Sequence, residues 1–467
     1  MRQRGPCRAT WSSSGDRTCP IRGASLTAGH PGPAFPVMLA RIPFLPALLA
    51  VGSRYLPRGS LVLLLGTLSA RAISTVGLLV TAAILGPSPY AALGVYVSIL
   101  SLLSVAACGR YEAAILAVRH EGDARALVML SQGICALFLL AVSSLCALVI
   151  LMGWNDLVAL PAAAMALLPL GILARVKLRI ENLILTRSGR PRVRARSAIV
   201  QSIVQPLVTL ASYWIGADAV LALVLGDAVG HLVAAFVLRM GNRDWRRETQ
   251  PRGALLHHAA KWRQMPLAGL PNAFLSIAFD SAPALLAGLT LPPHLGGQMI
   301  LALRLLDIPG FLVGFVAVPT LQRAIVEDKT PLRYALRPVL RLALMLGGMF
   351  LAIIVMAHFL SPLLLHTRWP ELFRLVQWFA LSSAFLAVTN PLIELVAIYG
   401  VEVRAFRRHL ASLLILAVCT AGLLIFGERV PSLALLLALA GLARAAMFSR
   451  LLFQQSRRER GAAVPAR

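Results

Sequence analysis

Long apolar stretches separated by short polar segments dominate the chain. Twelve of these stretches reach about 20 residues, the length that a helix needs to cross about 30 Å of hydrocarbon. They lie near residues 61–85, 88–108, 126–152, 157–183, 195–216, 218–240, 265–290, 296–325, 337–362, 370–399, 405–427 and 431–455. The pattern predicts an all-α polytopic membrane protein with twelve transmembrane helices.

Basic residues orient these segments. The loops on one side and the C-terminal end together carry 31 lysines and arginines, including a group from Arg175 to Arg196, whereas the opposite loops carry only Arg368 and Arg429. Short loops rich in lysine and arginine stay in the cytoplasm, so we expect both termini to be cytoplasmic. The loops predicted to lie outside are short, so no outer domain is expected.

Composition narrows the class of protein. The chain is 58% hydrophobic and 14% charged, whereas soluble proteins average about 45–50% and about 25%. This excludes a soluble enzyme, a disulfide scaffold and a disordered chain. The formal net charge of +26 follows from loop orientation and attraction to anionic membrane lipids, so it does not support nucleic-acid binding. The preference for arginine over lysine is typical of a GC-rich bacterial genome. An all-α polytopic protein of a bacterium is expected in the inner membrane.

A basic linker divides the chain into two parts. Residues 241–264 have six predicted spans on each side, which predicts an N-terminal six-helix bundle over 61–240 and a C-terminal six-helix bundle over 265–455. After the first span of each half, a proline-containing turn leads to a glycine and a new apolar run, so Gly94 and Gly297 correspond. Both halves begin on the cytoplasmic side, so we expect a parallel repeat.

The chain ends differ from the spans. Residues 1–37 hold Gly, Pro, Ser, Thr and Arg without periodicity, which is typical of disorder. They are either a disordered basic extension or a wrongly assigned start, with translation from Met38. Residues 38–60 predict an interfacial entry segment, because prolines interrupt their apolar run. Residues 456–467 predict a basic cytoplasmic tail.

Arginines within the spans are candidates for binding an anionic substrate. Ionisable groups at membrane depth are costly and usually line a cavity. Arg71 lies about ten residues, or about 15 Å, into the first span, and Arg304 lies in the eighth. The guanidinium fork suits phosphate oxygens, so Arg71 and Arg304 are candidates for binding the phosphate groups of an anionic substrate.

Carboxylates within the spans are candidates for ion coupling. These are Asp227, Asp280, Asp307 and Glu394. A purely structural interpretation is also open for two of them, because Arg304 and Asp307 are three residues apart and Asp227 and His231 are four apart. Residues at these spacings share a helix face and can neutralise each other.

Motifs for energy-coupled or covalent chemistry are absent from the sequence. The chain has no GxxxxGK[ST] loop, no H-E-x-x-H, no CxxC pair and no G-x-S-x-G elbow. We therefore expect no cofactor, no metal and no enzymatic activity. Transport would instead draw on an ion gradient, the membrane potential or removal of product.

Two stretches resemble a known family. The run ILGPSPYAALGVYVSIL precedes Arg110-Tyr111-Glu112-Ala113-Ala114-Ile115, and the second half contains FDSAPALLAGLTLPPHLGGQMILALRLLDIP. These are similar to Wzx-type flippases of lipid-linked oligosaccharides, in the multidrug/oligosaccharidyl-lipid/polysaccharide exporter superfamily. One departure is Met299, which stands where the family usually has tyrosine.

The resemblance implies a function. It implies that the protein flips a polyprenyl-diphosphate-linked oligosaccharide across the inner membrane by alternating access, for lipopolysaccharide, capsule or exopolysaccharide synthesis. It also marks Arg110, Tyr111 and Glu112 as a motif at the cytoplasmic face. A local ion pair of Glu112 with Arg110 or Arg119 is the simpler interpretation. Partners would be membrane lipids and the glycosyltransferases and polymerase of the same pathway.

Two alternatives stay open. One is a multidrug exporter of the same superfamily, for which an anionic cavity would be expected. The other is a membrane polysaccharide polymerase or ligase, for which the short outer loops are a disadvantage.

Overall fold

The computed structural model describes residues 58–118, 120–154, 159–243, 245, 254–327, 332–364, 367–398, 402–426 and 430–462. Side chains are described for most of these residues, and 311–339 are the largest exception. The extension at 1–37 and all but the last three residues of the predicted entry segment lie outside the described residues. Within the described part, every regular element is a helix.

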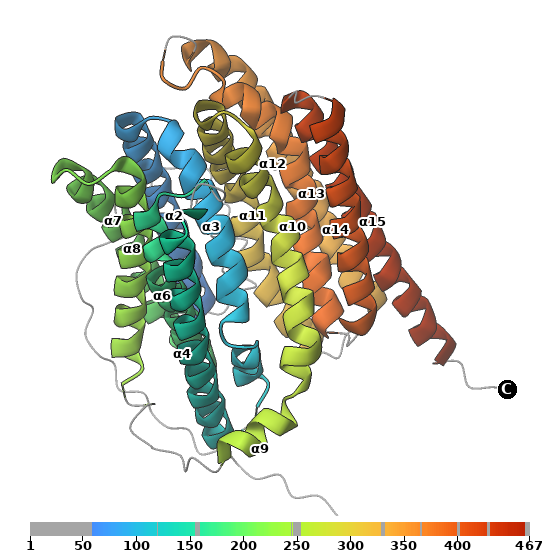
Figure 1. Ribbon diagram of the computed structural model, residues 1–467. Helices are drawn as coiled ribbons and strands as arrows, with labels where there is room; N and C mark the ends of the chain where they lie inside the picture. The colour runs from blue at the N-terminus through green and yellow to red at the C-terminus, as the bar shows by residue number, and fades with distance from the viewer. Residues whose placement is uncertain are drawn as a thin grey trace, which may run out of the picture. The chain divides into compact units, whose positions relative to one another are not determined.

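The N-terminal half contains helices that match the first six predicted spans (Figure 1). They are α2 (Arg58–Leu85), α3 (Ser88–Ala106), the 3₁₀ helix η2 (Tyr111–Leu116), α4 (Glu121–Leu151), α5 (Ala162–Ala166), α6 (Leu168–Arg187), α7 (Pro191–Trp214) and α8 (Ala219–Gly241). The predicted fourth span is divided into α5 and α6. Pro169 stands in the first turn of α6, where its missing N–H is tolerated.

The second half follows a short linker helix. Its elements are α9 (Ala254–Lys261), the π-helix η5 (Met265–Gly269), α10 (Leu270–Thr290), α11 (Pro293–Glu327), α12 (Leu332–Leu364), α13 (Leu372–Ile398), α14 (Glu402–Phe426) and α15 (Val430–Ala462). Figure 1 shows α9 at the end of α4, with which it is in contact. Part of the predicted linker is therefore a helix, and the predicted tail begins as a continuation of α15.

Eight of the described helices are long and apolar enough to cross a membrane. They are α2, α3, α4, α8, α10 with η5, α12, α13 and α15. The other four predicted spans fall on α6, α7, α11 and α14. In α6 and α7, several arginine side chains lower the mean hydropathy. The protein is therefore a multi-pass membrane protein. The number of twelve crossings and the cytoplasmic termini stay predictions.

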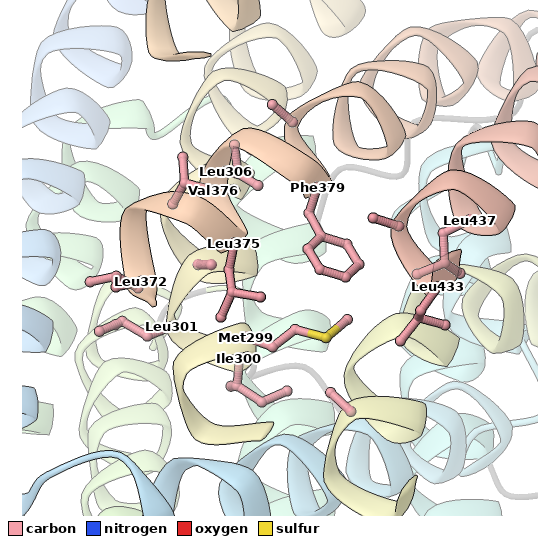
Figure 2. Packing of buried hydrophobic residues seen from close by; sticks show 14 of the residues in the cluster. Met299, Ile300, Leu301, Leu306, Leu372, Leu375, Val376, Phe379, Leu433 and Leu437 are labelled. Atoms are coloured by element: carbon pink, nitrogen blue, oxygen red, sulfur yellow. The ribbon is translucent and has the colours of Figure 1, made fainter. Parts of the chain in front are cut away.

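A cluster of buried apolar side chains packs the second half. Figure 2 shows Met299 of α11, Phe379 of α13 and Leu433 and Leu437 of α15 pointing toward one another. Met299 and Phe379 are 0% exposed. The methionine that departs from the family pattern therefore fills the core between three helices, where a flexible thioether adapts to the available space.

Small residues fix α7 between α2 and α8, its two main neighbours. An added Cβ at Gly77 of α2 would lie 2.7 Å from Pro206 of α7. An added Cβ at Gly230 of α8 would lie 2.9 Å from the Cβ of Gln205. Any larger residue at either glycine would push α7 away, so the position of α7 is tightly defined.

The two glycines of the predicted repeat both lie where α3 contacts α11. An added Cβ at Gly94 of α3 would overlap the side chain of Ile300 in α11, and one at Gly297 of α11 would overlap the carbonyl oxygen of Pro87, which precedes α3. Each helix thus approaches the other through its own glycine. This reciprocal contact agrees with corresponding positions in two repeats, and it joins the halves at the ends predicted to face outward.

Candidate functional site

A cavity of about 760 Å³ lies between helices of both halves. Its wall includes α2, α3, α6, α7 and α8 of the first half and α10, α11 and α13 of the second. Its charged and imidazole-bearing residues are Arg71, Arg175, Asp227, His231, Asp280, Arg304 and Asp307. The cavity therefore brings together the predicted arginines and three of the four predicted carboxylates, from segments far apart in the sequence.

Arg71 of α2 and Arg304 and Asp307 of α11 face this space from opposite halves. Arg304 and Asp307, whose side chains are both described, make no direct hydrogen bond or ion pair with each other, although the charges of Arg304 and Arg71 both act on Asp307. Asp307 is exposed to the cavity and Arg304 is half-buried. Both groups are therefore accessible to a substrate or an ion in the cavity.

Asp227 of α8 has a stronger partner than the one predicted. Its Oδ2 accepts a hydrogen bond from Arg175 of α6 at 3.2 Å, and Arg175 also donates to Ser101 Oγ of α3 at 3.0 Å. His231 Nδ1 contacts the Asp227 carbonyl oxygen at 2.7 Å and its carboxylate at 3.6 Å. The side chain of Asp227 is 8% exposed. Arg175, which the charge pattern grouped with a cytoplasmic loop, thus neutralises a carboxylate within the membrane.

Asp280 of α10 also pairs with an arginine, one that is not among the predicted site residues. Arg444 of α15 donates to Asp280 Oδ1 at 2.6 Å and to Ser276 Oγ at 2.8 Å. The Arg444 side chain is 0% exposed, and its guanidinium lies 4.4 Å from the centre of the Phe279 ring. Arg444 lies inside the apolar segment 431–455. Because a charged residue within a span usually has a partner there, this position could have identified Arg444 as a site residue from the sequence.

Asp280→Asn is expected to destabilise the protein by about 3–5 kcal/mol, because it leaves the fully buried Arg444 without its counter-ion. Thermal unfolding of the detergent-solubilised protein measures this. The double variant Asp280→Asn/Arg444→Met is expected to recover most of the loss, because no buried charge remains. An unchanged melting temperature for Asp280→Asn would mean that Arg444 is neutralised by another group.

The predicted cytoplasmic motif lies outside the cavity. Gly109 and Arg110 both have positive φ angles, of 56° and 63°, and turn the chain from α3 into η2. Glu112, which is 1% exposed, pairs with Arg179 of α6 at 3.4 Å. Its described partner is therefore Arg179 rather than Arg110, and Arg119 lies outside the described residues.

Tyr111, the central residue of this motif, contacts the linker helix. Its hydroxyl donates to the carbonyl oxygen of Ala259 in α9 at 3.3 Å. The motif thus connects η2 to α6 through Glu112 and to the linker through Tyr111. Glu394, the fourth predicted carboxylate, belongs to α13, but its side chain lies outside the described residues.

The described charges around the cavity are nearly balanced. Three arginines (Arg71, Arg175, Arg304) and three aspartates (Asp227, Asp280, Asp307) line it, and the fully buried Arg444 pairs with Asp280 from behind the wall. Arg175 and Arg444 are committed to Asp227 and Asp280. Arg71, Arg304 and Asp307 line the cavity as well, with the two arginines on opposite halves.

Comparison with known proteins agrees with this description. Residues 56–280 match the model of a family described as polysaccharide biosynthesis protein. No curated protein matches the sequence.

Solved structures share the fold at low sequence identity. An inward-facing multidrug resistance MATE family transporter of the MOP superfamily has a TM-score of 0.64 and 13% identity over 87% of this chain and 100% of that one. The lipid II flippase MurJ in an inward closed conformation has a TM-score of 0.61 and 11% identity over 83% and 86%. A mutant of the Vibrio cholerae MATE transporter VcmN has a TM-score of 0.55 and 14% identity over 87% and 98%.

These similarities confirm two sequence-based predictions. The chain is an all-α membrane protein with the fold of the MATE transporters and MurJ. The resemblance to polysaccharide exporters is confirmed by the family match over residues 56–280.

Proposed function

We propose that this protein is a flippase that carries a polyprenyl-diphosphate-linked oligosaccharide across the bacterial inner membrane for cell-surface polysaccharide synthesis. The observation that carries the proposal is the charge of the cavity. Arg71 and Arg304 face it from opposite halves, and Asp307 is the one described carboxylate of the wall outside the two ion pairs. Arginine forks in a space of low dielectric bind a diphosphate strongly.

The proposed mechanism is alternating access by the two halves. The diphosphate and the sugars occupy the cavity, while the polyprenyl tail stays in the lipid. Tyr90 lines the cavity at its predicted outer end, and its ring contacts the ring of the buried Trp369, with the ring centres 5.9 Å apart. This packing corresponds to a state that is closed toward the outside, from which the substrate would load on the cytoplasmic side.

Asp307 is the described carboxylate best placed to carry a coupling ion. Asp227 and Asp280 are each held by an arginine. Asp307 is exposed to the cavity and lies on the same helix as Arg304. A proton or cation on Asp307 would change the net charge that the substrate meets, which links ion binding to substrate binding.

A multidrug exporter is the second candidate, because the MATE fold is shared as closely as that of MurJ. An exporter of cationic drugs needs an acidic cavity. Here Arg71, Arg175 and Arg304 balance the three aspartates of the described wall, so the cavity is not acidic and this observation favours the flippase.

The test uses a strain that lacks the gene. We expect polyprenyl-linked glycan to accumulate on the cytoplasmic leaflet of inner-membrane vesicles, and the intact gene to reverse the accumulation. Glycan that reaches the outer leaflet but stays unpolymerised would indicate a polymerase or ligase instead. An unchanged lipid-linked pool would contradict the flippase and leave the drug exporter.

A further inference from the structure

Two glutamines on α7 line the same cavity and are not explained by a diphosphate site. Gln201 and Gln205 are four residues apart, so they share one face of α7. Both line the cavity and both are half-buried. Neither side-chain amide makes a hydrogen bond to any residue that the structure describes, so their hydrogen-bonding groups are directed to the contents of the cavity.

The helix that carries these glutamines is closely packed against its neighbours. Gln205 rests against Gly230 of α8, and the next residue, Pro206, rests against Gly77 of α2. A polar group in the membrane is costly unless a partner is supplied. Two such groups one helical turn apart on a constrained helix are therefore prepared for a polar and uncharged ligand.

The chemistry of the amide specifies the ligand class. Each glutamine offers two N–H donors and one carbonyl acceptor, which matches the donor and acceptor capacity of neighbouring sugar hydroxyls. The arginines of α2 and α11 supply charge for the diphosphate, whereas these amides of α7 are neutral.

We propose that Gln201 and Gln205 form a sugar-binding subsite that contacts the glycan of the substrate, beside the arginines that bind its diphosphate. This inference rests on the proposed function. In this proposal, α7 is the helix that lets the protein bind glycosylated lipid in preference to unglycosylated lipid.

The experiment measures binding by purified protein in detergent. The two probes are the lipid-linked glycan extracted from the strain that lacks this gene, and polyprenyl diphosphate of the same chain length without sugar. We expect Gln201→Leu and Gln205→Leu each to weaken binding of the glycosylated probe about ten-fold, and the double variant about a hundred-fold. Affinity for the unglycosylated probe should stay within about two-fold of the unaltered protein.

Gln377→Leu is the matched control, because Gln377 is a half-buried residue of α13 that does not line the cavity. It should bind both probes like the unaltered protein. Elution as a single species by size exclusion checks the folding of each variant.

Three results would overturn the subsite. These are equal binding of both probes by the unaltered protein, unchanged binding by the glutamine variants, or a loss that is equal for both probes. Failure of the unaltered protein to bind either probe would instead reject the flippase function itself.

Discussion

Replacing both Arg71 and Arg304 by alanine is expected to reduce glycan export at least about a hundred-fold while the protein stays folded. A hydrogen bond to a charged group contributes about 1.5–3 kcal/mol, so each arginine accounts for about a ten-fold to hundred-fold effect on diphosphate binding. Each single variant should therefore be clearly impaired. Export is measured by complementation of the deletion strain and by the leaflet distribution of the lipid-linked glycan.

Arg374→Ala provides the control for this prediction. Arg374 lies on α13, its side chain is 59% exposed, and it pairs with Glu371 and stacks on Trp378 outside the cavity. Surface ion pairs contribute little to stability, so this variant should export normally. Normal export by Arg71→Ala would remove Arg71 from the site, and normal export by Arg304→Ala would remove Arg304.

Gly297→Ala should be strongly destabilising, although it adds only one methyl group. The new Cβ would overlap the carbonyl oxygen of Pro87. This obstacle is backbone, which cannot rotate aside as a flexible side chain can, so α3 and α11 must separate at their first turns. Overpacking typically costs about 1–3 kcal/mol, and we expect a value at the upper end or beyond it. The melting temperature in detergent and the export activity should both fall.

The same substitution at Gly347 should have the opposite sign. Gly347 lies inside α12 with nothing within 4 Å of an added Cβ. Alanine favours a helix interior over glycine by about 0.5–1 kcal/mol, so Gly347→Ala should be neutral or slightly stabilising. A melting temperature for Gly297→Ala equal to that of Gly347→Ala would show that α3 and α11 do not approach each other this closely.

Much of the architecture could be predicted because the membrane imposes it. A long apolar segment in lipid must satisfy its own backbone hydrogen bonds, so it forms a helix. Each predicted span overlaps a described helix. The cost of placing charge in lipid also identified Arg71, Arg304 and three aspartates as cavity residues. For these residues, it was sufficient to know how deep each one lies in its predicted span and that charged residues are rare there.

The partners of the aspartates could not be predicted in the same way. Arg175 and Asp227 are separated by 52 residues, and Arg444 and Asp280 by 164. Such pairs depend on how helices pack, whereas sequence spacing reports only neighbours on one helix. The same holds for Glu112, which is reached by Arg179 from another helix rather than by the neighbouring Arg110; the alternative partner Arg119 lies outside the described residues.

The Arg444–Asp280 pair also has a consequence for biogenesis. An arginine at the centre of a helix adds about 2.5–3.5 kcal/mol to the free energy of inserting that helix into the bilayer, and α15 is synthesised after all the other described helices. Its counter-ion stands on α10, synthesised much earlier. Full stabilisation of α15 in the membrane is therefore coupled to the prior presence of α10, because Arg444 meets its counter-ion only when α10 is in place.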